Sequence, residues 1–214
     1  MQCRKYVSAV VGTVLALGLS VSLTAQEAKE AGAGAKKATE AEMMGMMMDM
    51  AKPGDAHKRL AEGVGEWSYV CRWWMNPQAP PSTSTGTCVS RTVMGGRYFI
   101  SESKGKMAFP GPDGKTMEMD YQGTSTEGYD NAKKKYVASW IDNLGTGIMS
   151  LEGTYDEQAK TLTYLAEYEM IPGVKTKMRE VIITKDKDHR SMEFYEVRGG
   201  KEVKMMEIDY TRKG

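Results

Sequence analysis

The stretch KYVASWIDNLGTGIMSLEGTYDEQAKTLTYLAEYEM, residues 135–170, decides the fold. Apolar and polar residues alternate along three short runs within it, and turn-forming segments at 143–145 and 156–157 separate those runs. Alternation of this kind is typical of a strand with one buried face. The connecting segments are too short for a helical crossover, so the stretch predicts consecutive antiparallel strands.

The same pattern extends in both directions along the chain. Ten runs fall at 67–75, 85–94, 97–107, 115–129, 135–142, 147–155, 161–170, 175–184, 190–197 and 202–212. Ten strands in an up-and-down order remove their unpaired edges by closing into a barrel, whereas a Greek-key sandwich needs longer connections. We therefore predict an all-β fold, an antiparallel up-and-down barrel of about ten strands with a short N-terminal helix. A two-sheet sandwich is the alternative.

The N-terminal part differs in composition from the rest. Residues 1–25 begin with Arg4 and Lys5, continue as an uncharged apolar run and end in small residues, which is typical of a cleaved secretory signal. The run is near the lower length limit for a membrane span, so an anchor is the alternative. We expect a linker and a Met-rich helix over 26–53 and the barrel domain over 54–214. The mature protein is then periplasmic or secreted, with no transmembrane segment after signal removal.

Charge and motifs exclude several classes of function. The chain has 29 Lys and Arg against 28 Asp and Glu, so it lacks the basic excess with which a protein holds nucleic acid. It contains no nucleophile elbow, zinc-protease helix or phosphate-binding glycine loop. We therefore assign no catalytic residue and no cofactor, and leave enzymatic activity open. His57 and His189 fall in predicted connections, where we expect both at the surface, and the oligomeric state is not predicted.

Two cysteines, Cys71 and Cys88, remain once residues 1–25 are removed. An oxidising compartment favours a disulfide between such a pair. Placing the two opposite each other would set the register of the first hairpin. Two free thiols are the alternative.

Alternation also assigns side chains to the inner face of the predicted barrel. Trp67, Tyr69, Cys71 and Trp73 share one face of the first strand, and the matching faces of later strands are rich in aromatic residues and Met. Apolar walls with a few polar groups are typical of small-molecule sites, so we predict binding of a small apolar ligand. The candidate binding residues are Glu102, Tyr121, Trp140, Asp142 and Tyr164.

Other interpretations of this inner face remain open. The same side chains could simply fill the barrel, because Met adapts to irregular gaps. An enzyme that uses cavity carboxylates such as Glu102 or Asp142 is a second hypothesis.

The segment 43–50 reads Met-Met-Gly-Met-Met-Met-Asp-Met. Thioethers are soft ligands for Cu(I), and Met43, Met47 and Met50 fall on one face of a helix. A flexible apolar helix that docks on the barrel or on a partner is the simpler interpretation. We therefore assign no metal site, and keep copper(I) or partner binding by this segment as an alternative function.

Several short motifs point to a known group of proteins. They are the Met-rich lead, Lys52-Pro53-Gly54, Gly65-Glu66-Trp67, Met94-Gly95-Gly96-Arg97-Tyr98, Gly128-Tyr129-Asp130-Asn131, Trp140-Ile141-Asp142-Asn143, Glu152-Gly153-Thr154-Tyr155-Asp156 and Met206-Glu207-Ile208. Residues 43–213 thereby resemble the bacterial family called domain of unknown function 1579. Gly-x-Trp at the start of the first strand also resembles the lipocalin and calycin barrels. That resemblance implies that Gly65, Trp67 and Arg212 close one end of the barrel, and it implies no established activity.

Overall fold

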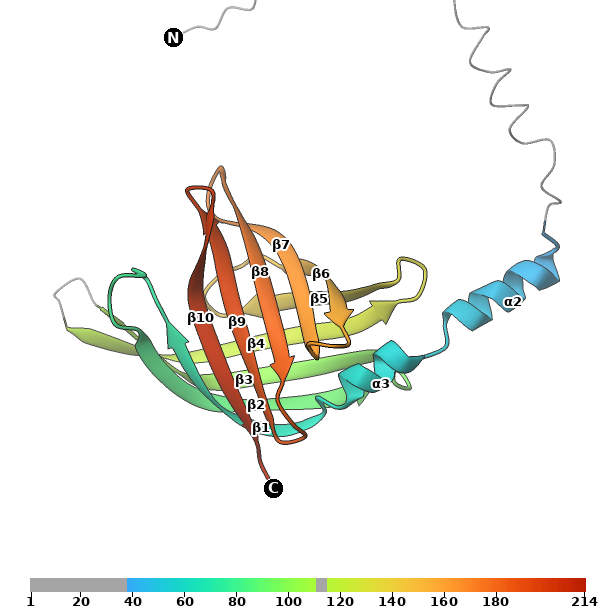
Figure 1. Cartoon of the computed structure of the whole chain (residues 1–214), viewed down its shortest axis with the longest axis horizontal. Coiled ribbons are helices and arrows are strands. Elements are labelled where there is room, and N and C mark those ends of the chain that lie inside the picture. Colours follow the sequence, from blue (N-terminus) through green and yellow to red (C-terminus); the bar gives the residue numbers. More distant parts are fainter. Residues whose placement is uncertain (1–37, 111–114) are drawn as a thin grey trace, which may run out of the picture. The chain divides into compact units, whose positions relative to one another are not determined.

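The computed structural model describes residues 38–110 and 115–214 (Figure 1). The predicted signal at 1–25 and the first part of the predicted linker lie outside these residues. The chain divides into two units, Met1–Met44 and Gly45–Gly214, and every described strand belongs to the second. Helix α2 spans Glu40–Met50 and helix α3 spans Asp55–Ala61. Neither of these two described helices is long and apolar enough to cross a membrane.

The described residues form ten strands. These are β1 (Gly65–Trp73), β2 (Ser82–Val93), β3 (Tyr98–Pro110), β4 (Thr116–Asp130), β5 (Lys135–Asp142), β6 (Met149–Asp156), β7 (Thr161–Ile171), β8 (Val174–Thr184), β9 (His189–Arg198) and β10 (Lys201–Arg212). Each strand pairs with the next in antiparallel fashion, and β10 pairs with β1, which closes the barrel. Figure 1 shows this ring of strands, in which the red β10 lies beside the turquoise β1. The predicted all-β up-and-down barrel is confirmed.

Two of the turns use the same local chemistry. Oδ1 of Asp130 accepts hydrogen bonds from the backbone N–H groups of Ala132 and Lys133, at 2.9 and 3.0 Å. Oδ1 of Asp156 accepts from the corresponding groups two and three residues further on, at 2.8 and 2.9 Å. Both turns end in a lysine with positive φ, Lys134 at 53° and Lys160 at 52°. An aspartate that caps its own turn therefore sets both hairpins.

Helix α3 packs at the end of the barrel where β2 joins β3 and β4 joins β5. Gly54 is its N-cap, and the ring of His57 accepts a hydrogen bond at Nδ1 from the Gly54 N–H at 3.1 Å. The expectation of a surface His57 is wrong, because the ring is only 5% exposed. His189 is exposed, as expected.

The main core lies between α3 and the strands, and its buried members are Leu60, Phe99, Tyr136, Leu151, Leu162, Tyr164 and Met178.

The first hairpin differs from the predicted register. Cys71 lies opposite Ser84, and Cys88 lies opposite Trp67, so the two cysteines are four positions apart along the hairpin. Both are buried free cysteines, and the expected disulfide is absent. The physical reason is the Tyr69 ring, which lies over Gly86 on β2 and Gly105 on β3, where any Cβ would collide with its hydroxyl. These two glycines fix the register that separates the cysteines.

Candidate ligand-binding cavity

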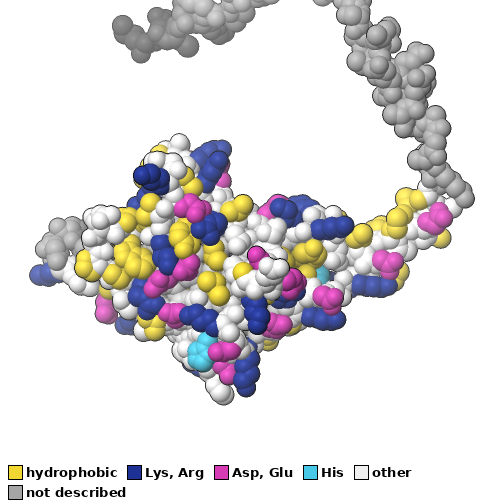
Figure 2. Space-filling view, viewed as in Figure 1, with side chains coloured by type: hydrophobic (Ala, Val, Ile, Leu, Met, Phe, Trp, Pro, Cys, Tyr) yellow, Lys and Arg dark blue, Asp and Glu magenta, His cyan; other side chains and the backbone are white. Residues whose placement is uncertain are grey.

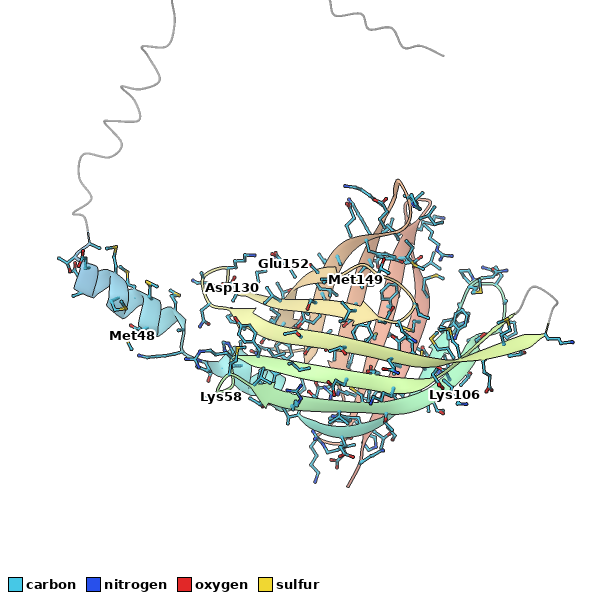
Figure 3. All side chains as sticks on the ribbon, turned by 180° about the vertical axis from the view of Figure 1, so that it is seen from behind. Met48, Lys58, Lys106, Asp130, Met149 and Glu152 are labelled. Carbon is cyan, nitrogen blue, oxygen red and sulfur yellow. The ribbon has the colours of Figure 1, made fainter. Side chains whose placement is uncertain are left out.

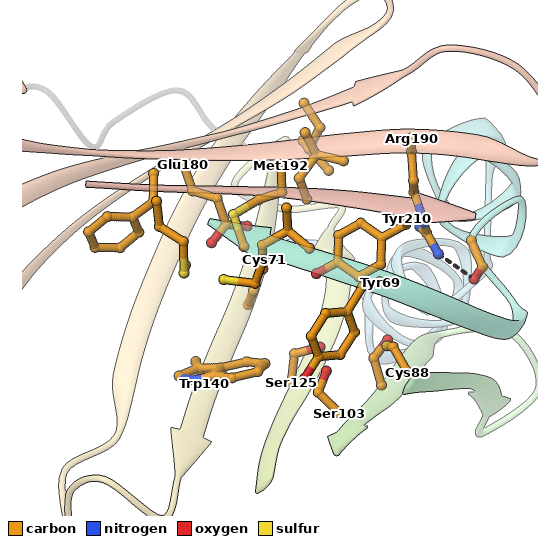
Figure 4. A pocket seen from close by; sticks show the side chains of 18 of the residues that line it. Tyr69, Cys71, Cys88, Ser103, Ser125, Trp140, Glu180, Arg190, Met192 and Tyr210 are labelled. Carbon is orange, nitrogen blue, oxygen red and sulfur yellow. Dashed lines mark hydrogen bonds between the residues drawn. The ribbon is translucent and has the colours of Figure 1, made fainter. Parts of the chain in front are cut away.

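A cavity of about 1180 Å³ occupies the interior of the barrel. Alternate residues of all ten strands line it, as the pleat of a strand requires. Most of the lining is aromatic or thioether, and serines on β2, β3 and β4 supply hydroxyl groups. The aromatic and Met members include Trp67, Tyr69, Trp73, Tyr121, Trp140, Tyr168, Phe194, Tyr210, Met107, Met149, Met178, Met192 and Met206. Figure 4 shows Tyr69, Tyr210, Trp140 and Met192 extending into this space from different strands.

The end of the cavity near α3 is closed by Trp67, which is 2% exposed. The guanidinium carbons of Arg190 and Arg212 lie 3.9 and 4.2 Å from the centre of the Trp67 ring. Arg212 also donates hydrogen bonds to the carbonyl oxygens of Val64 at 2.6 Å and Glu62 at 2.7 Å. These contacts tie β9 and β10 to the segment that joins α3 to β1, and so form a floor beneath the cavity.

Gly65 completes this floor. Its φ of +131° is a conformation that residues with a Cβ rarely adopt, and a Cβ at this position would lie 2.6 Å from Nη1 of Arg212. The structure thus places Gly65, Trp67 and Arg212 together at the closed end of the barrel.

The five candidate binding residues are distributed differently. Tyr121, Trp140 and Asp142 line the cavity, and Nε1 of Trp140 donates a hydrogen bond to Oδ2 of Asp142 at 2.9 Å. Tyr164 is fully buried in the core beside the cavity. Glu102 does not line the cavity: its side chain is 52% exposed and lies 3.9 Å from Nη2 of Arg91. The inner face of β3 carries Phe99, Ser101 and Ser103 instead, so the prediction for Glu102 is wrong by one position of the strand alternation.

Two carboxyl groups that the sequence analysis missed face the cavity. Glu127 on β4 and Glu180 on β8 both line it and lie deep within the barrel. Burial raises the pKa of both, and the negative charge of Glu127 helps to raise the pKa of Glu180 to about 8. The alternation contained a signal for both, since Glu127 shares a face with Tyr121 and Glu180 shares one with Met178.

Arg190 is a buried cation whose charge acts on Glu127. Its Nη2 donates a hydrogen bond to the carbonyl oxygen of Gly63 at 2.9 Å, drawn as the dashed line in Figure 4. Burial lowers the pKa of the guanidinium, while the charge of Glu127 opposes that change. Arg190 was missed for the same reason as the carboxylates: a charged residue on a strand is usually placed outside.

The two cysteines belong to the cavity wall. Burial raises the pKa of both thiols, that of Cys71 to about 11. A thiol with such a pKa is protonated and unreactive at neutral pH.

Many other charged side chains lie on the outer surface. In the face shown in Figure 2, basic and acidic groups intermingle over the strands. The Met residues of α2 are exposed, Met43 by 46%, Met47 by 67% and Met50 by 56%, and Figure 3 marks Met48 in the same helix. Within the described residues, no group of three or more His, Cys, Asp or Glu side chains could hold a metal ion.

Comparisons with known proteins relate this chain to a protein family and to a solved structure. A family profile described as "Protein of unknown function (DUF1579)" matches residues 52–212. The crystal structure of Rv2717c from M. tuberculosis is similar to this chain with a TM-score of 0.52 and 14% sequence identity. The similarity covers 76% of this chain and 100% of that one, and at this identity it shows a shared fold alone. A search of curated proteins found no match.

Proposed function

We propose that this chain, which belongs to the DUF1579 family of proteins of unknown function, binds a small, largely apolar ligand inside its barrel. The observation that carries the proposal is the cavity of about 1180 Å³, because a barrel filled by its own side chains would leave no such space. Small-molecule sites typically measure about 300–1000 Å³. The cavity therefore has room for a ligand of that class.

The lining determines the chemistry that the cavity favours. Aromatic rings and thioethers present apolar surface, and each CH₂ group that a ligand buries against them gains about 0.8 kcal/mol. An empty apolar cavity lacks these dispersion contacts, so an apolar ligand stabilises the folded protein as it binds. Serine hydroxyls such as Ser103 and Ser125 can orient a polar group of the ligand by hydrogen bonding.

A matched pair of substitutions on β4 tests the proposal. Ser125 is buried and lines the cavity, whereas the neighbouring Thr126 is exposed on the outer face of the same strand. Ser125→Phe takes up cavity volume, and Thr126→Phe adds the same ring outside. Native mass spectrometry after incubation with decanol measures the bound fraction, and thermal unfolding shows that each variant is folded.

We expect the wild-type protein and Thr126→Phe to bind decanol and Ser125→Phe to lose most of that binding. Equal binding by the two variants would overturn the proposal, since the ligand would then be held outside the barrel. Absence of binding by the folded wild-type protein would overturn it as well.

The exported location is a further proposal, supported by the composition of residues 1–25. N-terminal sequencing of the protein purified from a periplasmic extract tests it. We expect the mature chain to begin at Gln26; an intact N-terminus in the cytoplasmic fraction would contradict export.

A further inference from the structure

Three polar groups inside the barrel lie close together without partners. Tyr164 on β7 lies directly opposite Glu180 on β8, and its ring lies over Gly153, where a Cβ would be 2.6 Å from Cδ1. Glu127 reaches the same space from β4, and its charge acts on both Tyr164 and Glu180. Within residues 38–110 and 115–214, neither carboxyl group makes a hydrogen bond or an ion pair, and the buried hydroxyl of Tyr164 has no hydrogen-bond partner.

Polar groups without partners lower the stability of the folded protein when no ligand is bound. Burying a polar group without a hydrogen bond costs about 1–3 kcal/mol, and more for a charged group. Two carboxyl groups that face each other also repel when both are ionised. Carboxyl groups that line a cavity and have no protein partner leave their acceptors available to another molecule.

The charged neighbours of the two carboxyl groups indicate which charge that molecule carries. In the described part of the chain, Arg190 is the one cation whose charge acts on either carboxylate, and it acts on Glu127 alone. Its guanidinium is already committed to the floor, where it contacts Trp67 and the carbonyl oxygen of Gly63. Arg190 therefore does not pair with Glu180, which leaves that carboxyl group available to a cation in the ligand.

We propose that the cavity ligand carries a protonated nitrogen that binds between the carboxylates of Glu127 and Glu180, while its apolar body contacts the aromatic and Met lining. This inference rests on the proposed function and names the ligand class. An ammonium group has donors for both carboxylates, and the unpartnered hydroxyl of Tyr164 is within the range of their charges. A divalent metal ion fits the pair less well, because no third His, Cys, Asp or Glu side chain in the described residues joins it.

Binding of a cation between Glu127 and Glu180 is coupled to the release of a proton. The groups that surround the pair are Tyr164 on β7, Arg190 on β9, Tyr210 on β10 and Cys88 on β2. Glu180 holds its proton at neutral pH, because its pKa is about 8. When the ammonium group binds, that proton leaves to solvent and the carboxylate pairs with the ligand. Affinity should therefore rise with pH up to about 8, with release of a proton on binding.

Three probes with the same alkyl chain test the inference: decylamine, decanol and decanoate. Isothermal titration of the purified full chain at pH 7 measures the affinity for each. We expect decylamine to bind about tenfold or more tightly than decanol, because charge-assisted hydrogen bonds add about 1.5–3 kcal/mol. Decanoate should bind most weakly. Titrations of decylamine in buffers of different ionisation enthalpy should show release of a proton.

Substitutions distinguish this inference from the proposed function. Glu127→Gln and Glu180→Gln should abolish the preference for decylamine and retain decanol binding, which also shows that the variants are folded. Glu152→Gln is the matched control, since Glu152 on β6 is 54% exposed on the outer face and pairs with Lys133. Equal affinity for decylamine and decanol, or an equal effect of Glu152→Gln, would overturn the inference and leave the proposed function standing. Binding of none of the three probes would overturn both.

Discussion

Arg212 places its guanidinium carbon 4.2 Å from the centre of the Trp67 ring, joining the last strand of the barrel to the first at the closed end of the cavity. A cation over an indole ring at this distance is favourable, and more so when water is excluded. Arg212 also donates hydrogen bonds to the carbonyl oxygens of Glu62 and Val64, just after the end of α3. This contact therefore both closes the barrel and provides the floor on which a ligand would rest.

Truncating Trp67 should strongly destabilise the fold. Trp67→Ala leaves a cavity in the floor, and we expect the free energy of unfolding to fall by about 3–5 kcal/mol. Denaturant unfolding followed by circular dichroism measures this. Val70→Ala is the control, because Val70 lies on the same strand with 37% exposure and should cost less than about 1 kcal/mol. Similar losses for the two variants would show that Trp67 is not part of the core.

Replacing Arg212 by lysine tests the floor in a second way. Lysine keeps the positive charge and lacks the planar fork that donates to two carbonyl oxygens at once. We expect Arg212→Lys to lower the free energy of unfolding by about 0.5–1.5 kcal/mol, the net contribution of a typical hydrogen bond. The same change at Arg198, which is 45% exposed, should have little effect. A neutral effect of Arg212→Lys would mean that its charge alone matters.

The stability of the protein should depend on Glu180 in a defined pH range. Its pKa is about 8 in the folded protein and 4.5 ordinarily, so the folded state keeps a proton that the unfolded chain releases. The free energy of unfolding should therefore fall as pH rises between these values, by at most about 1.4 kcal/mol per pH unit. Thermal unfolding from pH 5 to 8 measures this slope. Glu180→Gln should flatten the profile; an unchanged slope would contradict the burial of this carboxyl group.

The cysteines should behave as two protected thiols. Because Cys71 and Cys88 are unpaired, addition of dithiothreitol should leave the melting temperature of the protein unchanged. An aromatic disulfide reagent should modify both thiols in denaturant and neither rapidly in the native protein, since burial raises the pKa of each. A melting temperature that falls on reduction would show that a disulfide forms after all.

Much of this barrel could be predicted from sequence because strand alternation is a local property. The fifth strand begins and ends at the predicted residues, Lys135 and Asp142, since turns with clear signals flank it. The turn at 156–157 was predicted for the same reason. The alternation placed Tyr121 and Trp140 on the inner face, and both line the cavity.

The register of the first hairpin and the pair of cavity carboxyl groups depend on contacts between strands that are distant in sequence. The register of the first hairpin depends on how Tyr69 fits over Gly86 and Gly105, which no local pattern shows. Glu127 and Glu180 come together only because β4 and β8 face each other in the closed barrel. Each glutamate by itself resembles a solvated strand residue, and the pair becomes visible only in three dimensions.

Photo-crosslinking tests the central claim, that the barrel interior is the ligand site, most directly. The full chain is incubated with decanol bearing a diazirine, irradiated and digested, and the modified residues are mapped by mass spectrometry. We predict modification of inward-facing residues from several strands, among them Tyr69 and Met192, and loss of that modification in Ser125→Phe. Modification confined to the exposed Met residues of α2 or to outward-facing residues such as Thr126 would contradict the account.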